Sequence, residues 1–240
     1  MNHPSNEIPF VNRSTGPDAL REGVAVLVDK PKGWSSFKVV RVLRALTGIR
    51  KIGHAGTLDP MATGLLICCV GRAATKRIDA FVGMRKVYTG TIQLGGTTAS
   101  YDAETPVTAT GSHTTITDTD IRSAFMRFTG DIMQTPPMYS AVHVGGQRLY
   151  KLARKGKEVE RAPRPVSVYT FELTGRNAGE VDFRVACSKG TYVRSLAHDV
   201  GQTLGCGAYL SKLRRTAIGN FSIDNALSLE ELGATVQPSS

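Results

Sequence analysis

Apolar and polar residues are arranged along this chain in short blocks that predict both strands and helices. Continuous apolar runs at residues 24–28 and 65–70 are each followed by turn-forming residues, which is typical of buried strands. Partial alternation of apolar and polar residues predicts further strands at 86–94, 166–173, 181–187 and 209–218. The strands and helices follow no regular βαβ rhythm, and no internal repeat is visible, so we predict an α+β protein with a mixed sheet.

Helical periodicity accounts for most of the remaining blocks. Between a Ser35 or Ser36 N-cap and a left-handed end at Gly48, apolar residues fall on one face, which predicts a helix. Similar patterns predict helices at 73–82, 117–128, 148–155, 193–204 and 228–232. Residues 105–117 are rich in Thr, Ser and Gly, and we expect them to form a surface loop.

The pattern also suggests where the folded domain begins and ends. Residues 1–22 are polar without periodicity and are predicted to be a mobile N-terminal tail, while 234–240 form a C-terminal tail. Residues 23–233 are expected to be one domain. Within it, the basic, Gly- and Pro-containing segment at about 136–165 is expected to form an arm on the surface.

Charge narrows the class of partner. The chain has 240 residues, of which 41% are hydrophobic, and its 30 Lys and Arg exceed its 20 Asp and Glu, giving a net charge of +10. A basic protein of this kind favours a polyanionic partner, and nucleic acid is the leading candidate. The longest uninterrupted apolar run, 65–70, is too short to span a bilayer, and no secretion signal opens the chain, so we expect a cytoplasmic protein with no membrane contact.

The cysteines give no indication of a metal site. Cys68, Cys69, Cys187 and Cys206 form neither a CxxC pair nor a zinc-finger spacing. Three of them lie in apolar stretches, where buried reduced thiols are the ordinary expectation. The cysteines therefore predict no metal site.

One segment of the chain is basic without any compensating acid. It runs from Lys30 to Leu58, and its cations are Lys30, Lys32, Lys38, Arg41, Arg44, Arg50 and Lys51. Such a run is usually a solvated face. Because this one precedes a glycine-rich loop directly, we favour a role facing RNA.

The loop at 53–66 contains the first candidate for chemistry. Asp59 is its only acid, and the three glycines and one proline around it allow tight turns and close approach of a partner. A solitary accessible carboxylate suits a nucleophile. Asp followed by Pro60 is also the pattern of a helix N-cap and first helical residue, and from these two residues alone the cap is favoured.

Three other positions are candidates on residue type alone. Tyr88 follows two cations and suits base stacking, although a core tyrosine has the same pattern. Arg194 lies where the turn at 188–192 enters a helix and could hold a carboxylate ionised, or could be an ordinary surface arginine. His54 suits stacking in the place of an extruded base, or a local hydrogen bond within its loop.

Several motifs, taken together and in this order, resemble the bacterial TruB-type tRNA pseudouridine synthases. They are KPKGWSS at 30–36, GHAGTLDP at 53–60, KVY at 86–88, PMYSA at 137–141, CSKGTYVR at 187–194, and LRR at 213–215 after GCGA at 205–208. The resemblance spans about residues 23–221, nearly the whole predicted domain. It implies a mixed, mostly antiparallel central sheet flanked by helices and loops, with a catalytic cleft across the sheet.

The resemblance also implies a reaction: isomerisation of uridine to pseudouridine at position 55 in the T loop of tRNA, without cofactor or metal. Asp59 matches the family's nucleophile, which attacks the flipped nucleotide at C1′ or at C6. Tyr88 matches the tyrosine that packs on the base, and Tyr192 the one proposed to help remove the C5 proton. Arg194 matches the arginine that pairs with the nucleophile.

The same resemblance assigns His54 to the space left by the flipped base and Leu213 to the pocket. Basic residues expected to contact RNA are Lys30, Lys32, Arg154, Lys189, Arg214 and Arg215. Extrusion costs a few kcal/mol and is cheaper for loop bases than for paired ones.

We expect tRNA, through its T arm, to be the partner, with no guide RNA, no obligate protein partner and a monomeric state. Many family members carry a further PUA-type domain, whereas this sequence ends shortly after its acidic helix, so we expect some of the tRNA grip to be weaker or to come from the arm. The family commonly has Ser-Ala-x-Lys where this chain has His143, so no phosphate contact is assigned there. The alternatives are a non-catalytic RNA-binding or tRNA-folding protein using the same basic surface, and an RNA-guided synthase.

Overall fold

The computed structural model describes residues 9–10, 23–144 and 146–236. The tails predicted at 1–22 and 234–240 fall mostly outside these residues. In the described part of the N-terminal segment, Phe10 forms a β-bridge with Ala25. Its ring packs against that of Phe221, with 4.6 Å between the two ring centres. At the other end, helix α8 (Leu229–Val236) runs three residues past the predicted boundary at 233.

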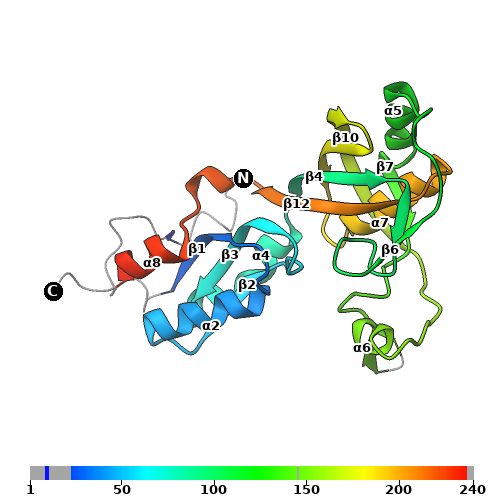
Figure 1. Ribbon diagram of the computed structural model, residues 1–240. Helices are drawn as coiled ribbons and strands as arrows, with labels where there is room; N and C mark the ends of the chain where they lie inside the picture. The colour runs from blue at the N-terminus through cyan, green and yellow to red at the C-terminus, as the bar shows by residue number, and fades with distance from the viewer. Residues whose placement is uncertain (1–8, 11–22, 145, 237–240) are drawn as a thin grey trace. The chain divides into compact units, whose positions relative to one another are not determined.

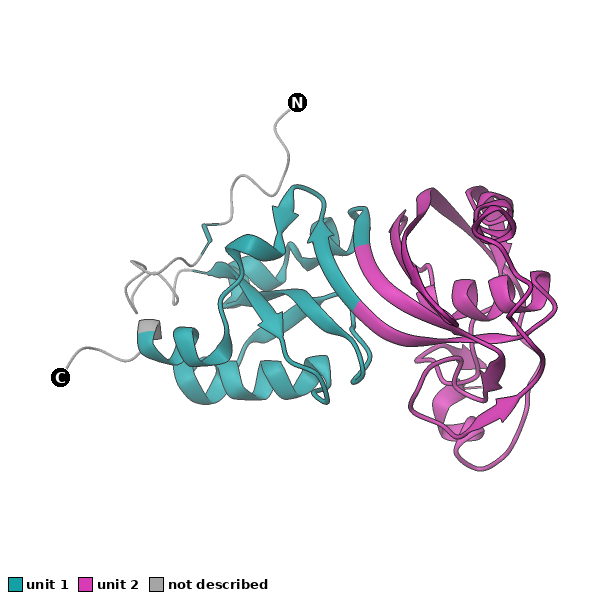
Figure 2. Ribbon diagram, turned by 45° about the horizontal axis from the view of Figure 1, so that its top comes forward, with its two compact units in different colours: residues 1–87, 214–240 teal, residues 88–213 magenta. Residues whose placement is uncertain are grey.

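The chain divides into two compact units, coloured separately in Figure 2. Unit 1 contains residues 1–87 and 214–240, and unit 2 contains residues 88–213. Strands β4 (Lys86–Leu94) and β12 (Ala208–Ile218) have residues in both. The main sheet is mixed, as predicted, with antiparallel and parallel pairs of strands.

Unit 1 is built around strand β3 (Thr63–Val70), which pairs antiparallel with β1 (Val24–Lys30) and β2 (Ile52–Ala55) and parallel with the end of β12. Its other elements, several of them labelled in Figure 1, are α2 (Ser36–Thr47), α3 (Arg72–Thr75), α4 (Ile78–Gly83), β13 (Phe221–Ser222), a short 3-10 turn (Ile223–Asn225) and α8.

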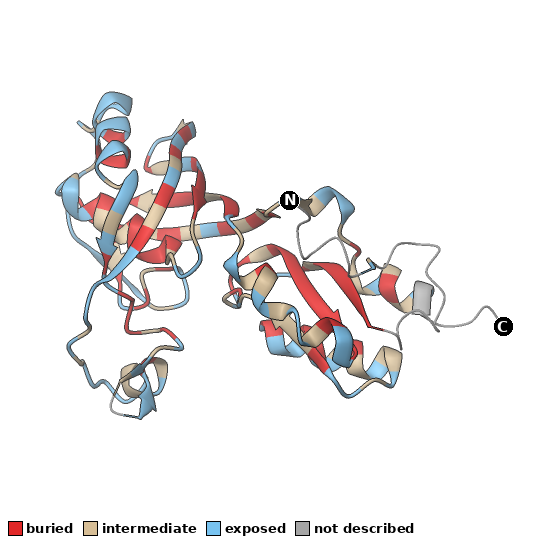
Figure 3. Cartoon of the chain, turned by 180° about the vertical axis from the view of Figure 1, so that it is seen from behind, coloured by how far each residue is buried: buried red, intermediate tan, exposed pale blue. Residues whose placement is uncertain are grey.

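Both faces of the β1–β3 pair are covered, which explains why these strands are continuous apolar runs rather than alternating ones. One face packs against Val39 and Leu43 of α2, and the opposite face packs against Phe81 of α4. In Figure 3 strands β1 and β3 are coloured almost entirely as buried. The thiols of Cys68 and Cys69 lie on these two faces, and burial raises the pKa of both, that of Cys69 to about 12.

Unit 2 contains the strand order β12-β4-β11-β10-β7. Its core includes Phe125, which stacks on Phe171 at 3.8 Å between ring centres, and the buried Leu196 of α7. The elements that build it are β10 (Arg164–Asn177), β11 (Glu180–Cys187), β7 (Gly130–Gln134), α5 (Asp118–Arg127) and α7 (Val193–Thr203), with the small strands β5 (Gly96–Thr98), β6 (Val107–Ala109), β8 (His143–Val144) and β9 (Gln147–Arg148), and helix α6 (Leu149–Ala153).

Most predicted elements are confirmed, and the caps show why. Ser35 caps α2 by accepting from the amide of Lys38, and Gly48 ends it with φ +70°. Thr117 caps α5 in a reciprocal capping box with Asp120. The strand predicted at 86–94 is β4, with the same bounds.

Two predictions about secondary structure were wrong, and strand β7 was missed. The helix at 73–82 is two short helices, because α3 ends at Thr75, whose hydroxyl bonds to the carbonyl of Gly71. The loop at 105–117 contains β6, whose three side chains are all exposed and so leave no apolar pattern. Strand β7 was missed because its first two residues, Gly130 and Asp131, are exposed and disfavour a strand.

Candidate active site

Asp59 lies in unit 1, in the loop that joins β2 to β3. No helix begins at Pro60, so the helix-cap alternative was wrong. Instead the backbone makes a turn, in which the amide of Ala62 donates to the carbonyl oxygen of Asp59 at 3.1 Å. The Asp59 side chain is half-buried. The turn therefore fixes the backbone of Asp59 through main-chain bonds.

Two neighbouring segments hold this loop in place. The Ser36 hydroxyl accepts from the amide of Leu58 at 2.9 Å and contacts its carbonyl at 3.1 Å. The amide of Gly33 donates to the Pro60 carbonyl at 2.8 Å. Lys30, which is fully buried, turns its ammonium toward the carbonyls of Trp34 at 2.7 Å and Pro60 at 3.5 Å. The start of α2 and the end of β1 thus form a support beneath the Asp59 turn.

Arg215 of β12 fastens both ends of the same loop. Its Nε donates to the carbonyl of Leu65 at 2.7 Å and its Nη2 to that of Gly56 at 3.1 Å. The side chain is only 1% exposed. Gly64 permits this close approach: its φ is +101°, and a Cβ there would lie 2.8 Å from the Arg215 amide nitrogen. A glycine is therefore required by space as well as by conformation.

His54 lies on β2, opposite Cys68 of β3. Burial, and then the positive charge of Arg215, lower the pKa of its imidazole. The ring is consequently neutral at physiological pH. A neutral, partly buried aromatic ring suits stacking better than it suits ion pairing.

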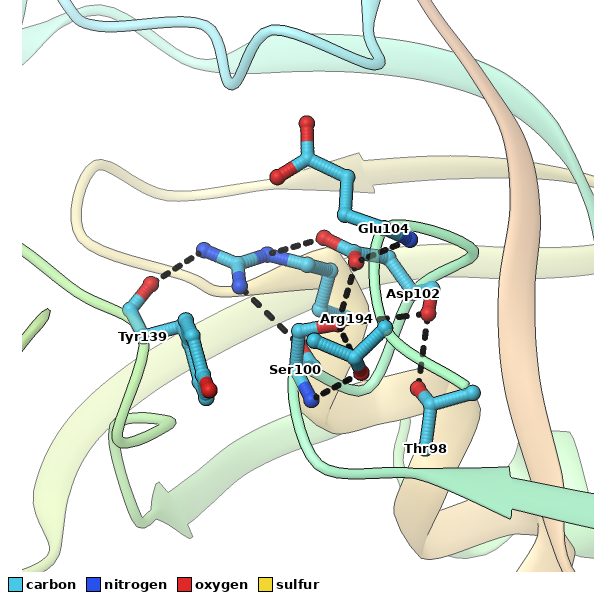
Figure 4. Close-up of polar contacts among 7 residues, drawn as sticks. Thr98, Ser100, Asp102, Glu104, Tyr139 and Arg194 are labelled. Carbon is cyan, nitrogen blue, oxygen red and sulfur yellow. Dashed lines mark hydrogen bonds and ion pairs between the residues drawn. The ribbon is translucent and has the colours of Figure 1, made fainter. Parts of the chain in front are cut away.

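Arg194 lies in unit 2, in the first turn of α7, and is 4% exposed. Figure 4 shows its guanidinium among three partners. Nη1 donates to the carbonyl of Ser100 at 3.0 Å, Nη2 donates to that of Tyr139 at 2.9 Å, and Nε lies 3.5 Å from a carboxylate oxygen of Asp102. The alternative of an ordinary surface arginine is wrong.

Asp102 is the residue that sequence reasoning missed. It is 1% exposed, and its Oδ1 accepts from the Ser100 hydroxyl at 2.5 Å and from the Glu104 amide at 3.0 Å. These donors, together with the Arg194 guanidinium, fix the position of the Asp102 carboxylate. The signal in the sequence was two acids within three residues, Asp102 and Glu104, in an otherwise basic chain.

Tyr192 is fixed through its backbone. The amide side chain of Gln134, 2% exposed, accepts from the Tyr192 amide at 2.7 Å and donates to the Tyr192 carbonyl at 3.0 Å. Gln134 was also missed, because a lone glutamine at the end of an unrecognised strand carries no pattern. Tyr88 and Leu213, each 9% exposed, lie on β4 and β12 of the same unit.

The residues expected to contact RNA differ in their exposure. Lys32, Arg154 and Lys189 are exposed. Arg214 is half-exposed and makes a bidentate pair with Asp29, at 2.7 and 3.0 Å. Lys30 and Arg215 are both buried and directed at backbone carbonyls, and their contact with RNA stays a prediction.

The predicted site residues thus fall into two groups. Asp59 and His54 share unit 1, and Tyr88, Tyr192, Arg194 and Leu213 share unit 2. The pairing of Arg194 with Asp59 and the cleft across the sheet stay predictions. Among the described residues, no cluster of His, Cys, Asp and Glu of a size to hold a metal ion is found, and no helix is long and apolar enough to cross a membrane.

Known proteins resemble this chain over most of its length. Residues 44–193 match the model for the TruB family pseudouridylate synthase (N terminal domain), and residues 194–238 match that for the tRNA pseudouridylate synthase B C-terminal domain. The tRNA pseudouridine synthase B of Opitutus terrae is 51% identical, covering 89% of this chain and 88% of its own, and that of Flavobacterium johnsoniae is 45% identical, covering 89% and 96%.

Among solved structures, a chain in the crystal structure of a Cbf5-Nop10-Gar1 complex has the same fold, with a TM-score of 0.71 and 28% identity. The match covers 97% of this chain and 58% of that one.

Proposed function

The chain belongs to the TruB family of pseudouridylate synthases, and we propose that it isomerises uridine to pseudouridine in tRNA, at position 55 of the T loop. The observation that carries the proposal is the 51% identity to a tRNA pseudouridine synthase B, which extends over nearly the full length of both chains. The net charge of +10 fits an RNA substrate. We further propose that the chain acts as a monomer, without a guide RNA.

In the proposed reaction Asp59 attacks the flipped uridine, at C1′ or at C6 of the base. The bond between N1 and C1′ breaks, the uracil turns over, and C5 bonds to C1′. C5 loses its proton and N1 gains one, so the product has the same atoms as the substrate. No oxidant, reductant or second substrate is needed.

The construction of the Asp59 turn supports its role as nucleophile. A nucleophile must be held in position before the substrate arrives, since misplacement by about 1 Å can cost 100-fold in rate. The bonds from Ser36, Gly33 and Arg215 are all made to the backbone of the loop, and none of them uses the Asp59 carboxylate. These bonds can therefore hold the loop backbone in place before the substrate arrives.

The residues of unit 2 are assigned complementary roles. Arg194, held by Asp102 and two carbonyls, supplies a fixed positive charge that keeps the nucleophile ionised. Tyr192, fixed by Gln134, helps to remove the C5 proton, and Tyr88 packs on the base. Leu213 lines the pocket. His54 of unit 1 takes the place left by the flipped base.

The test is incubation of the purified chain with an unmodified tRNA transcript, followed by mapping of pseudouridine. The expected product is a single pseudouridine at position 55. A transcript in which uridine 55 is replaced by cytidine is the matched control and should gain none. Because neither a guide nor another protein is present, product formation excludes the RNA-guided alternative. Tight binding without product would favour the tRNA-folding alternative instead.

A further inference from the structure

Helix α2 of unit 1 has an outer face that the proposed reaction does not use. The side chains of Val39, Val40 and Leu43 are buried against the sheet. On the opposite side Phe37, Lys38 and Arg41 are exposed, and the helix contains no acid. At 56% exposure, Phe37 is one of the few large apolar residues on the described surface. An exposed ring among cations offers a stacking surface for a base beside contacts for phosphates.

The aromatic rings on this face are paired with cations. The ammonium of Lys38 lies 3.9 Å from the centre of the Trp34 ring, and the guanidinium carbon of Arg44 lies 5.7 Å from that of Phe37. These contacts hold the long cationic side chains against a surface, so less conformational entropy is lost when they bind an anion. Lys32, just before the helix, is exposed as well. A face that combines fixed cations with an exposed ring has the chemistry of a nucleic-acid contact.

The start of helix α2 lies close to Asp59. The helix begins at Ser36, whose hydroxyl is bonded to Leu58, next to Asp59. Its 12 residues extend about 18 Å from that point. At roughly 3.4 Å per stacked nucleotide, this is the length of about five nucleotides. An RNA whose target uridine lies at Asp59 therefore has backbone phosphates within reach of the helix.

We infer that this face, which we call the α2 surface and define as Lys32, Trp34, Phe37, Lys38 and Arg41, binds the tRNA backbone within about five nucleotides of the target uridine. This inference rests on the proposed function for the identity of the RNA. Lys32, Lys38 and Arg41 contact phosphates, and Phe37 packs against a ribose or an unpaired base.

Two variants of the full chain test the α2 surface by direct binding to the tRNA transcript over a range of salt concentrations. In K32Q/K38Q/R41Q the slope of log affinity against log salt should become shallower by roughly 2, because about 0.7 is lost for each phosphate contact. In F37A the affinity should fall about tenfold, since stacking on one ring contributes 1–3 kcal/mol, whereas F37W should retain the wild-type affinity.

The matched controls lie on α5 of unit 2. Arg122, Arg127 and Met126 are similarly exposed on a helix of similar length, but acids share that helix. R122Q/R127Q should keep the salt slope to within the error of measurement, and M126A should keep the affinity. Since every substituted side chain lies at least partly in solvent, urea unfolding should show intact folding for all these variants.

The outcomes separate this inference from the proposed function. If wild-type protein forms pseudouridine but the α2 variants bind tRNA with unchanged affinity and salt slope, the α2 surface is overturned and the proposed function stands. If the wild type forms none, the proposed function fails, and the salt slopes still decide whether the face binds RNA. Equal losses in the α5 controls would also overturn the inference, because they would show a non-specific charge effect.

Discussion

The two groups of proposed active-site residues are held in place by different means. In unit 1 the turn that contains Asp59 is fixed by bonds to backbone carbonyls and by a glycine that admits Arg215. In unit 2 Arg194 is fixed by a buried carboxylate together with two carbonyls. The first arrangement depends on space and conformation, and the second on compensated charge. They should therefore respond to different kinds of substitution.

The largest expected effect comes from removing one charge of the unit 2 pair. In Arg194→Met, Asp102 would be left buried without its cation, and loss of one partner of a buried pair costs about 3–5 kcal/mol. Urea unfolding should show this loss, with no detectable pseudouridine formation. The double variant Arg194→Met/Asp102→Leu should recover part of the stability but none of the activity. If the single variant unfolds like the wild type, the charge-based account of unit 2 is wrong.

Adding a single methyl group at Gly64 of unit 1 should also lower the free energy of unfolding. Gly64→Ala places a Cβ against the backbone of Arg215 at a position with φ +101°. We expect a loss of about 2–3 kcal/mol in the free energy of unfolding, from strain and displacement together. Gly33→Ala is the matched control, since its φ is +79° with nothing within 4 Å of the new Cβ. It should lose only about 1 kcal/mol, and equal losses at both positions would contradict a role for space.

Gln134 tests whether Tyr192 depends on its backbone bonds. Gln134→Leu keeps a similar volume but removes both bonds to Tyr192, at a cost of about 1–3 kcal/mol in stability. As a positioning residue, it should lower kcat by more than it raises KM. Gln134→Glu retains one acceptor for the Tyr192 amide and should restore part of kcat. A fall in stability with unchanged kcat would mean that Gln134 serves the fold alone.

The smallest effect concerns pH and His54. Because burial and Arg215 lower the pKa of this imidazole, the unfolded chain binds a proton more readily than the folded chain at pH values below 6.5. The wild type should therefore lose stability, relative to His54→Gln, as the pH falls from 7.5 to 5. Urea unfolding of both proteins at the two pH values measures this difference. A wild-type advantage that grows on acidification would show that the imidazole is charged in the fold.

The sequence predicted the strands and caps well because those features are local. Val24 to Val28 and the Ser35 and Gly48 caps are recorded in neighbouring residue types. What it could not predict were contacts between distant residues. Nothing near Asp102 indicates that a residue 92 positions later, Arg194, supplies its cation, and nothing near Lys30 shows that its ammonium is turned inward. The resemblance supplied roles for site residues but not these supports.

Asp59→Asn tests the central claim most directly. The measurement is pseudouridine formation at position 55 of a tRNA transcript in a single turnover, with transcript binding measured on the same preparation. An amide has nearly the shape of the carboxylate but cannot act as the nucleophile, so no product should form while the transcript is still bound with an affinity close to that of the wild type. Product at the wild-type rate would contradict the assignment of Asp59.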